Sequence, residues 1–273
     1  MDNLNFLKPV SVSNKIRIGR RGDGGYVVYK PSLDKIDVLM TYGVGWDVDF
    51  EIDFFNLTQK RVFMHDPTMF EDNYISKPHC KRLLKKWKFQ SLYQYLQFST
   101  KWKKHLEYLD SNGVKFVNEG IATQKGQKYD VLWNHLCRNE ITDQAILLKM
   151  DIEGHEYAIL ESDDFDQCIP CIDQIIIEIH DLKNKLRRLK EIIEKLHAYF
   201  EIVHIHGNNH SEPFTLYTEK GDISFPDVIE LTLVKRESIV PQDLLSENID
   251  YPIDGLDYQN TPFKQPIRNL KFE

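Results

Sequence analysis

The chain has 273 residues, 41% of them hydrophobic and 28% charged, and its 35 basic and 42 acidic residues give a formal net charge of −7. Its longest apolar run has four residues, whereas a transmembrane helix needs about 20, and its N-terminus has neither the basic nor the apolar region of a secretory signal. A net acidic chain is also a poor candidate for a dedicated duplex-DNA binder. We therefore expect a cytoplasmic protein with no transmembrane segment and no duplex nucleic acid as a partner.

Apolar runs of strand length alternate with helical stretches along the chain. The sequence predicts a strand over 37–42, a helix over 48–58, strands over 61–66, 114–117, 145–151 and 174–180, a helix over 182–200, and strands over 201–206 and 227–234. The runs at 145–151 and 174–180 are almost continuously apolar, as is typical of parallel strands covered on both faces. The last two strands lack a crossover helix between them, so we expect an antiparallel pair at one edge. The predicted fold class is α/β: a Rossmann-like class I methyltransferase fold, with a mostly parallel seven-stranded sheet and helices on both faces.

A turn that contains glycines follows the first predicted strand. Tyr42 ends this strand, and Gly43 and Gly45 allow the backbone to approach a ligand closely where open α/β sheets bind their ligands. Asp66 follows Gly45 by 21 residues, at the end of the second strand, where a carboxylate can accept hydrogen bonds from ribose hydroxyls. Val48 replaces the third glycine of the dinucleotide fingerprint. The glycine turn and Asp66 together favour a binding site for a ligand with a nucleoside over a tight turn that binds no ligand. The valine at position 48 argues against a dinucleotide.

The four cysteines of the chain include one pair with CxxC spacing, Cys168 and Cys171. A zinc ribbon needs a second such pair, and a thioredoxin-like site would place the pair at the start of a helix that follows a strand. Here the pair precedes a strand. We therefore expect reduced, structural thiols.

One long motif carries a family resemblance. Residues 147–160, LLKMDIEGHEYAIL, strongly resemble the central K-x-D-x-E-G-x-E motif of the FkbM-type methyltransferases. Shorter matches follow the order of the family's motifs between residues 17 and 235: 23–27, 42–45, 50–51, 65–68, 178–180, 206–209 and 230–232. The resemblance implies a class I fold, S-adenosylmethionine (SAM) as methyl donor, and O-methylation of a sugar or another hydroxyl-bearing metabolite. The cofactor-binding residues that it implies are Asp23, Tyr42, Gly43, Gly45, Glu51, Asp66, Pro67, Glu119, Gly120 and Asp151.

Polar side chains mark the carboxyl ends of the later strands, and three of them are our catalytic candidates: Asp151, His180 and His206. Adjacent strands lie ~4.8 Å apart, so these residues can converge on one pocket. In one reading, His180 or His206 is the general base that removes the proton of an acceptor hydroxyl. In the other, Asp151 and His180 bind a divalent cation that acidifies this hydroxyl, and mixed carboxylate and imidazole ligands suit Mn²⁺ better than Mg²⁺. Glu156 is expected to be structural, as a cap of the helix that follows.

A basic, aromatic segment lies between the second and third predicted strands. Residues 73–106 contain nine Lys and Arg and no Asp or Glu, which leaves 26 basic against 42 acidic residues in the rest of the chain. A solvated basic face and a surface for an anionic acceptor explain this pattern equally well; an anionic membrane surface or single-stranded nucleic acid would also fit it. We treat residues 70–112 as a helical insert that is a candidate substrate lid.

These observations predict a single methyltransferase domain over 1–273, with an N-terminal extension over 1–36 and a C-terminal tail over 238–273. The expected function is SAM-dependent O-methyl transfer to a sugar or glycan, which the basic segment suggests is anionic. The alternatives are methylation of another small molecule or of a protein nitrogen, and a binding module that has lost catalysis. The oligomeric state stays open.

Overall fold

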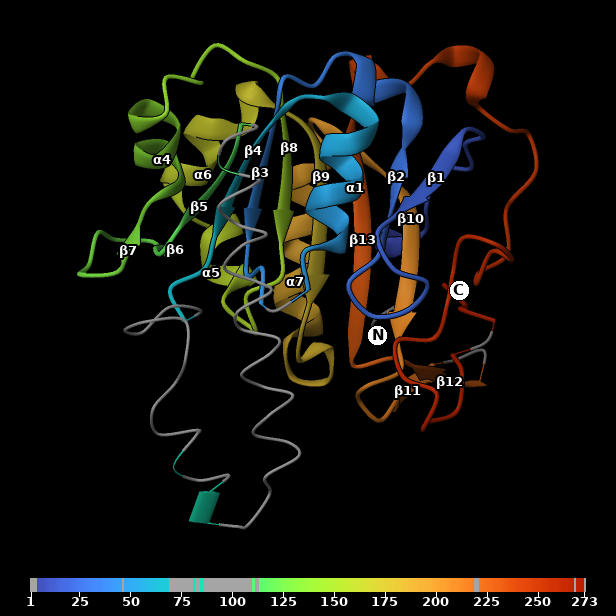
Figure 1. Cartoon of the computed structure of the whole chain (residues 1–273). Helices are drawn as coiled ribbons and strands as arrows, with labels where there is room; N and C mark the ends of the chain where they lie inside the picture. Colours follow the sequence, from blue (N-terminus) through green and yellow to red (C-terminus); the bar gives the residue numbers. More distant parts are fainter. Residues whose placement is uncertain are drawn as a thin grey trace.

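The computed structural model of the chain describes residues 4–45, 47–68, 81, 84–85, 110, 113–218, 221–267 and 269–272. Its centre is a seven-stranded sheet with the order β10–β13–β9–β8–β3–β4–β5 (Figure 1). The parallel strands next to one another are β3 (Val38–Tyr42), β4 (Arg61–His65), β5 (Val114–Val117), β8 (Ile146–Met150) and β9 (Ile172–Ile179). Strand β13 (Val228–Lys235) is antiparallel to both of its neighbours, β9 and β10 (Phe200–Asn208). This order, with one reversed strand, confirms the predicted class I methyltransferase fold.

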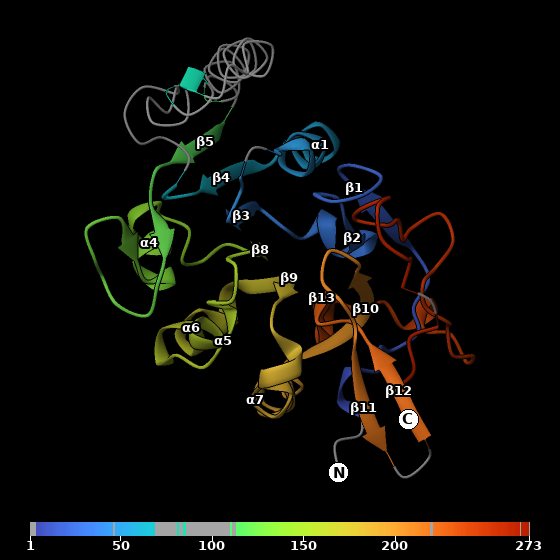
Figure 2. The ribbon, with the colours of Figure 1, turned by 90° about the horizontal axis from the view of Figure 1, so that it is seen from below.

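Helices and a β-hairpin cover the two faces of the sheet (Figure 2). One face carries helix α1 (Asp49–Thr58) and the hairpin of β1 (Lys15–Ile18) and β2 (Tyr26–Tyr29); the other carries α4 (Leu132–Arg138), α5 (Glu156–Leu160), α6 (Asp163–Cys168) and α7 (Leu182–Leu196). Side chains of β3 alternate between these layers, since Met40 packs in the cluster with α4 to α7 and Leu39 in the cluster with α1. Every residue of β3 is therefore buried.

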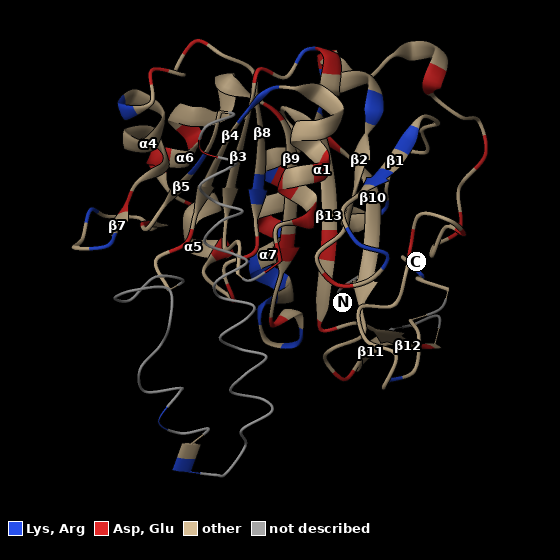
Figure 3. Cartoon of the chain, viewed as in Figure 1, with Lys and Arg blue, Asp and Glu red and all other residues tan. Residues whose placement is uncertain are grey.

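Helix α7 shows how the sequence pattern specifies an element and where it misleads. Its apolar residues recur with helical spacing and are buried, while the exposed side chains of Arg187 and Glu191, and of Lys190 and Glu194, form ion pairs. Figure 3 shows that charged residues are frequent along this helix. The helix ends at Leu196, not at residue 200 as predicted. Phe200 continues the apolar spacing, but it is buried as the first residue of β10. The prediction of this boundary was therefore wrong.

Several short elements were not predicted from the sequence. They are the helices α4 and α6, the hairpin β1–β2, the hairpin of β11 (Phe214–Thr218) and β12 (Gly221–Phe225), the short pair of β6 (Gly120–Ile121) and β7 (Tyr129–Asp130), and the 3₁₀ turns Asn5–Leu7, Lys30–Asp34, Ile169–Cys171, Arg236–Ser238 and Pro241–Asp243. The β1–β2 hairpin places the predicted N-terminal extension against the sheet, where β2 contacts β13, β10 and β9. The extension is therefore part of the fold.

Two further parts of the chain complete the description. Of the predicted basic insert, 70–112, all but Lys81, Leu84, Lys85 and Asp110 lie outside the described residues. No helix in the described part of the chain is long and apolar enough to cross a membrane. Cys168 and Cys171 are free thiols that donate hydrogen bonds to backbone carbonyls, and burial raises the pKa of both. This arrangement is consistent with structural thiols.

Candidate functional site

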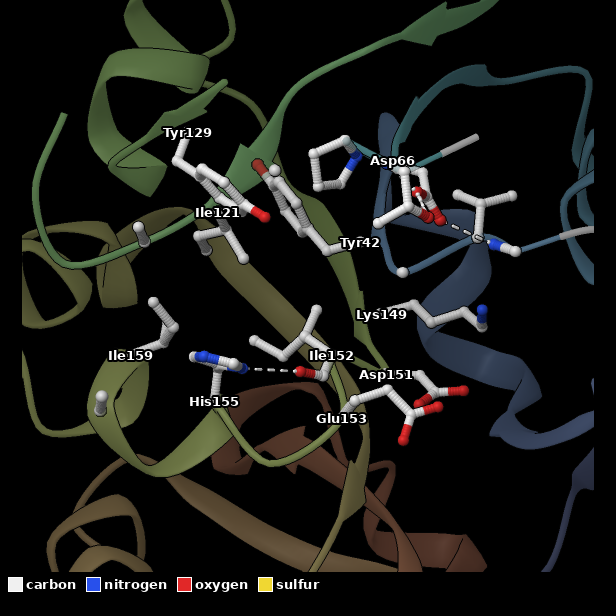
Figure 4. A pocket seen from close by; sticks show the side chains of 18 of the residues that line it. Tyr42, Asp66, Ile121, Tyr129, Lys149, Asp151, Ile152, Glu153, His155 and Ile159 are labelled. Carbon is white, nitrogen blue, oxygen red and sulfur yellow. Dashed lines mark hydrogen bonds between the residues drawn. The ribbon is translucent and has the colours of Figure 1, made fainter. Parts of the chain in front are cut away.

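A cavity of about 740 Å³ opens at the carboxyl ends of β3 and β8 (Figure 4). Its walls come from the turn before β2, the glycine turn after β3, the end of β4, the β6 segment, and the loop between β8 and α5. Eight of the predicted cofactor-binding residues line it: Asp23, Tyr42, Gly43, Gly45, Asp66, Pro67, Gly120 and Asp151. The sequence thus pointed to residues that the fold brings to one cavity.

The two glycines of the turn have different roles. Gly43 has a φ of +76°, and a Cβ atom there would lie 1.6 Å from the carbonyl oxygen of Asp151. Only glycine lets the ends of β3 and β8 approach this closely. Gly45 has a φ of +59°, but a Cβ atom there would meet nothing within 4 Å. The missing side chain of Gly45 therefore leaves open space beside the cavity.

Asp66 holds the glycine turn and the end of β4 together. Its Oδ2 accepts a hydrogen bond from the backbone N–H of Gly45 at 2.9 Å, as Figure 4 shows. Its Oδ1 accepts from the backbone N–H of Thr68 at 2.8 Å and from its hydroxyl at 2.7 Å. The carboxylate is buried yet lines the cavity, so it can also accept from the hydroxyls of a bound ribose.

Two predicted cofactor-binding residues lie outside the cavity lining. Glu51 is fully buried, accepts a hydrogen bond from Thr41 at 2.8 Å, and pairs with Lys149 at 3.3 Å. Glu119 pairs with Arg138 at 2.5 Å and lies 3.4 Å from Nε2 of His135. Both carboxylates thus contact protein groups next to the cavity.

Among the lining residues that the sequence did not assign to the site are Lys149, Tyr26 and Tyr129. The Lys149 ammonium lies 4.8 Å from the centre of the Tyr26 ring, and the Tyr26 hydroxyl donates to Asp151 Oδ2 at 3.2 Å. The position of Lys149 within an otherwise apolar strand was the signal that could have identified it as a functional residue. Tyr129 lies in no recognisable sequence motif. It reaches the cavity because β7 pairs with β6, which places Tyr129 beside Gly120.

Next to this cavity, the ligating atoms of Asp151, Glu178 and His180 all lie within 4.8 Å of one another. Burial raises the pKa of the Asp151 carboxyl, although Lys149 and His180 partly offset the effect. Burial, followed by the nearby charges of Asp151 and Glu230, raises the pKa of Glu178 well above its usual range. Glu178 accepts one hydrogen bond from Asn208 at 2.7 Å. The cluster therefore concentrates carboxylates that a hydroxyl proton or a cation would stabilise.

His180 lies outside the cavity lining, beside Asp151. Its Nδ1 is 3.0 Å from Oε1 of Glu156, and its Nε2 is 3.7 Å from carboxylate oxygens of Glu153 and Glu178. Burial alone would lower the pKa of the imidazole, but the hydrogen bond to Glu156 and the surrounding carboxylates raise it above its usual value. Glu156, expected to be purely structural, thus contacts a predicted catalytic residue.

His206 has a different environment. Its Nδ1 lies 3.0 Å from Oδ1 of Asp257 and its Nε2 lies 3.1 Å from Oδ1 of Asn260, so both ring nitrogens face oxygen acceptors. The same Asp257 oxygen is 2.9 Å from Nε2 of His204. His206 does not line the cavity. This placement favours an imidazolium that binds the C-terminal tail to β10.

Comparisons with known proteins identify the family. The family model of the methyltransferase FkbM domain matches residues 11–208. No curated protein matches the chain significantly. Among solved structures, the chain is similar to a precorrin-6Y C5,15-methyltransferase of Geobacter metallireducens, with 16% identity over 74% of this chain and 81% of that chain and a TM-score of 0.36. It is also similar to a putative tRNA (m1A22) methyltransferase of Streptococcus pneumoniae in complex with SAM, with 14% identity over 74% of this chain and 68% of that chain and a TM-score of 0.34.

These identities and TM-scores are too low to support an argument about the acceptor. The FkbM match, by contrast, spans more than half of the chain and runs from before β1 to the end of β10. It includes the glycine turn, Asp66 and the segment from Lys149 to Glu156. The chain therefore belongs to the FkbM family of methyltransferases, whose methyl donor is S-adenosylmethionine.

Proposed function

We propose that the chain transfers the methyl group of SAM to a hydroxyl of a sugar or glycan. The observation that supports this most is the position of Asp151, which both lines the cavity and belongs to the cluster with Glu178 and His180. A hydroxyl bound to this cluster would lie next to a methyl donor in the cavity. Methyl transfer is an in-line displacement, so such an arrangement supplies the proximity that the reaction needs.

The cavity residues fit SAM. Asp66 offers a buried carboxylate for the ribose hydroxyls, and the open space beside Gly45 admits a ligand against the backbone. Ile121 and Ile159 add apolar walls. Binding of SAM would then leave Asp151 at the border between donor and acceptor.

The acceptor hydroxyl must lose its proton, and the cluster offers two ways. His180 can accept the proton as a general base, because imidazole acts as a base near neutral pH. Alternatively, the two carboxylates and the imidazole fit a divalent cation, Mn²⁺ rather than Mg²⁺, which would lower the pKa of a bound hydroxyl. In both cases Asp151 and Glu178 orient the hydroxyl through hydrogen bonds or charge.

A transfer assay with methyl-labelled SAM tests the proposal. The panel holds neutral sugars, phosphorylated sugars, oligosaccharides, amines and a peptide, and mass spectrometry locates the label. We expect an O-methylated sugar. Label found only on nitrogen would favour the alternative in which carboxylates hold an amine, and no transfer to any class would contradict the proposal.

The two ways of removing the proton are separated by the same assay with a chelator. If a cation is used, chelation abolishes transfer, Mn²⁺ restores it, and Asp151→Ala remains inactive under both conditions. If His180 is the base, chelation changes nothing and His180→Gln loses activity. Asp254→Ala, an exposed acid in the tail, is the matched control for Asp151→Ala.

A further inference from the structure

We propose that Glu156 is a positioning residue that fixes the orientation and tautomer of the His180 ring, so that the Nε2 lone pair of the neutral ring faces Asp151 and Glu178. The inference rests on the proposed function, in which His180 acts at the acceptor hydroxyl. It assigns a role to the last glutamate of the K-x-D-x-E-G-x-E motif, which in this chain reaches back from the first turn of α5 to the residue after β9.

Two backbone donors surround one carboxyl oxygen of Glu156. Its side chain is fully buried, and Oε1 lies 3.2 Å from the backbone nitrogen of Ile152 and 3.1 Å from that of Gly154. Both N–H groups donate, so the oxygen between them is an acceptor. These hydrogen bonds and the one from His180 offset the effect of burial and hold the pKa of the Glu156 carboxyl below its usual value. Oε1 of Glu156 therefore acts as a hydrogen-bond acceptor towards its neighbours.

A carboxylate can only accept, and this determines which nitrogen of His180 carries the proton. Nδ1 lies 3.0 Å from Glu156 Oε1, so Nδ1–H is the donor. In the neutral ring, Nε2 then has a free lone pair, and this atom is the one near Glu153 and Glu178. The Tyr157 hydroxyl donates to the carbonyl oxygen of His180 at 2.8 Å and holds the backbone of the same residue. Glu156 and Tyr157, two consecutive residues of α5, thus hold the ring and the backbone of His180, respectively.

The comparison with His206 shows what this arrangement achieves. Nε2 of His206 has an oxygen acceptor at hydrogen-bond distance, Oδ1 of Asn260 at 3.1 Å, so this nitrogen presents no lone pair. At His180, Nδ1 has its acceptor in Glu156, whereas the carboxylate oxygens of Glu153 and Glu178 lie 3.7 Å from Nε2, beyond hydrogen-bond distance. A ring held in this way can accept a proton or bind a cation through Nε2, which a carboxylate on the other nitrogen is known to support. Glu156 therefore suits His180 to either form of the proposed chemistry.

The test measures the tautomer directly. Long-range ¹⁵N–¹H correlation spectra of the full chain, labelled at histidine and prepared with a chelator at a pH where the rings are neutral, show which nitrogen carries hydrogen. The signal that His180→Gln removes is that of His180. We expect the Nδ1–H form in the wild type. In Glu156→Gln, the ratio of Nδ1–H to Nε2–H should fall about tenfold or more, the loss expected for one charge-assisted hydrogen bond.

Glu161→Gln is the matched control, because this exposed residue in the same segment pairs only with Arg188 in the described part of the chain, and the tautomer of His180 should not change. An Nε2–H form in the wild type would overturn the inference, whether or not Glu156→Gln folds. An unchanged ratio in a folded Glu156→Gln that still binds SAM would overturn it as well. Transfer to the sugar panel at the wild-type rate in His180→Gln would instead contradict the proposed function and leave the tautomer result intact.

Discussion

Three aromatic side chains, those of Tyr42, His65 and His135, stack on one another, and Tyr42 lines the cavity. The rings of Tyr42 and His65 lie 4.8 Å apart and those of His65 and His135 lie 4.5 Å apart. The Tyr42 hydroxyl is 2.8 Å from Nδ1 of His135. Burial lowers the pKa of His65 well below its usual value and lowers that of His135 from 6.5 to about 4. Both imidazoles are therefore neutral at pH 7, which links the stability of this stack to pH.

Acid should destabilise the fold through this stack. A histidine whose folded pKa is lowered stabilises the native state fully above the unfolded pKa near 6.5, and this contribution is lost as the pH falls towards 4. We expect the His135 contribution to be on the order of 3 kcal/mol between pH 7 and pH 4. Urea unfolding at both pH values measures it. His135→Phe should lose less stability over this range than the wild type, and an equal loss in the two proteins would contradict the account.

The two glycines of the turn should differ sharply in their tolerance of a side chain. Gly43→Ala places a Cβ atom inside the contact with the Asp151 carbonyl, so we expect a loss of at least ~3 kcal/mol of stability and loss of SAM binding. Gly45→Ala should cost only about 1 kcal/mol, because its strain comes from the positive φ alone. Thermal unfolding and calorimetry with SAM compare the two variants. Equal stability of both would show that the approach of β3 to β8 is not as tight as described.

At the scale of the elements, the sequence predicted those strands and helices whose burial requires a clear pattern of apolar residues. The strands β3, β8 and β9 and helix α7 lie close to their predicted positions because each has a continuous apolar run or a helical apolar stripe. The β1–β2 hairpin was not predicted, although β1 alternates polar and apolar residues and β2 is apolar throughout, because each strand has only four residues. Its polar side chains have distant partners: Lys15 donates to a carbonyl oxygen of β10, and Arg17 to carbonyl oxygens of nearby loops. Such strands are stabilised by partners that are distant in the sequence, and the sequence alone does not identify these partners.

The basic segment gives a prediction about the acceptor. Asp151, Glu178 and Glu230 disfavour an anion at the reacting hydroxyl, so an anionic acceptor should carry its charge elsewhere. Charge reversal of Lys85, Lys86 and Lys103 should raise KM for a phosphorylated sugar about tenfold and leave KM for a neutral sugar unchanged. Steady-state kinetics with the acceptors of the panel measure both. An unchanged KM for the phosphorylated sugar would mean that these lysines form a solvated face.

At the scale of the whole molecule, the C-terminal tail closes the fold. Asp243 accepts hydrogen bonds from Ser13, Asn14 and Tyr29 near the N-terminal hairpin. Asp257 bridges His204 and His206, and these hydrogen bonds hold the pKa of its carboxyl far below the usual range despite burial. The tail, left without a role by the sequence, therefore connects the N-terminal hairpin with strand β10.

Loss of the Asp257 charge should be costly. Asp257→Asn removes one partner of a buried ion pair, for which we expect a loss of about 3–5 kcal/mol. The lowered pKa also means that this stabilisation is present above pH 4 and is lost as the pH falls below that value. Urea unfolding at pH 7 compares the variant with Asp254→Asn, whose exposed side chain should contribute less than ~0.5 kcal/mol. Equal effects of the two substitutions would show that the tail is not anchored here.

The site was predictable where one motif places residues at a strand end. Gly43, Gly45, Asp66 and Asp151 follow directly from the topology of the sheet, because parallel strands end at one edge. The roles of His180 and His206 could not be distinguished, since they depend on Glu156 and on Asp257, 24 and 51 residues away in the sequence. Tertiary contacts of this kind decide which nitrogen of a histidine is free.

Isothermal titration calorimetry with SAM tests the central claim most directly. The account predicts binding of one SAM per chain to the wild type, and binding weakened by at least tenfold in Asp66→Ala, which loses the carboxylate beside Gly45. Asp49→Ala, an exposed acid on α1, should bind as the wild type does. No heat of binding at millimolar SAM, or equal affinity in Asp66→Ala and the wild type, would contradict a cofactor site at the glycine turn.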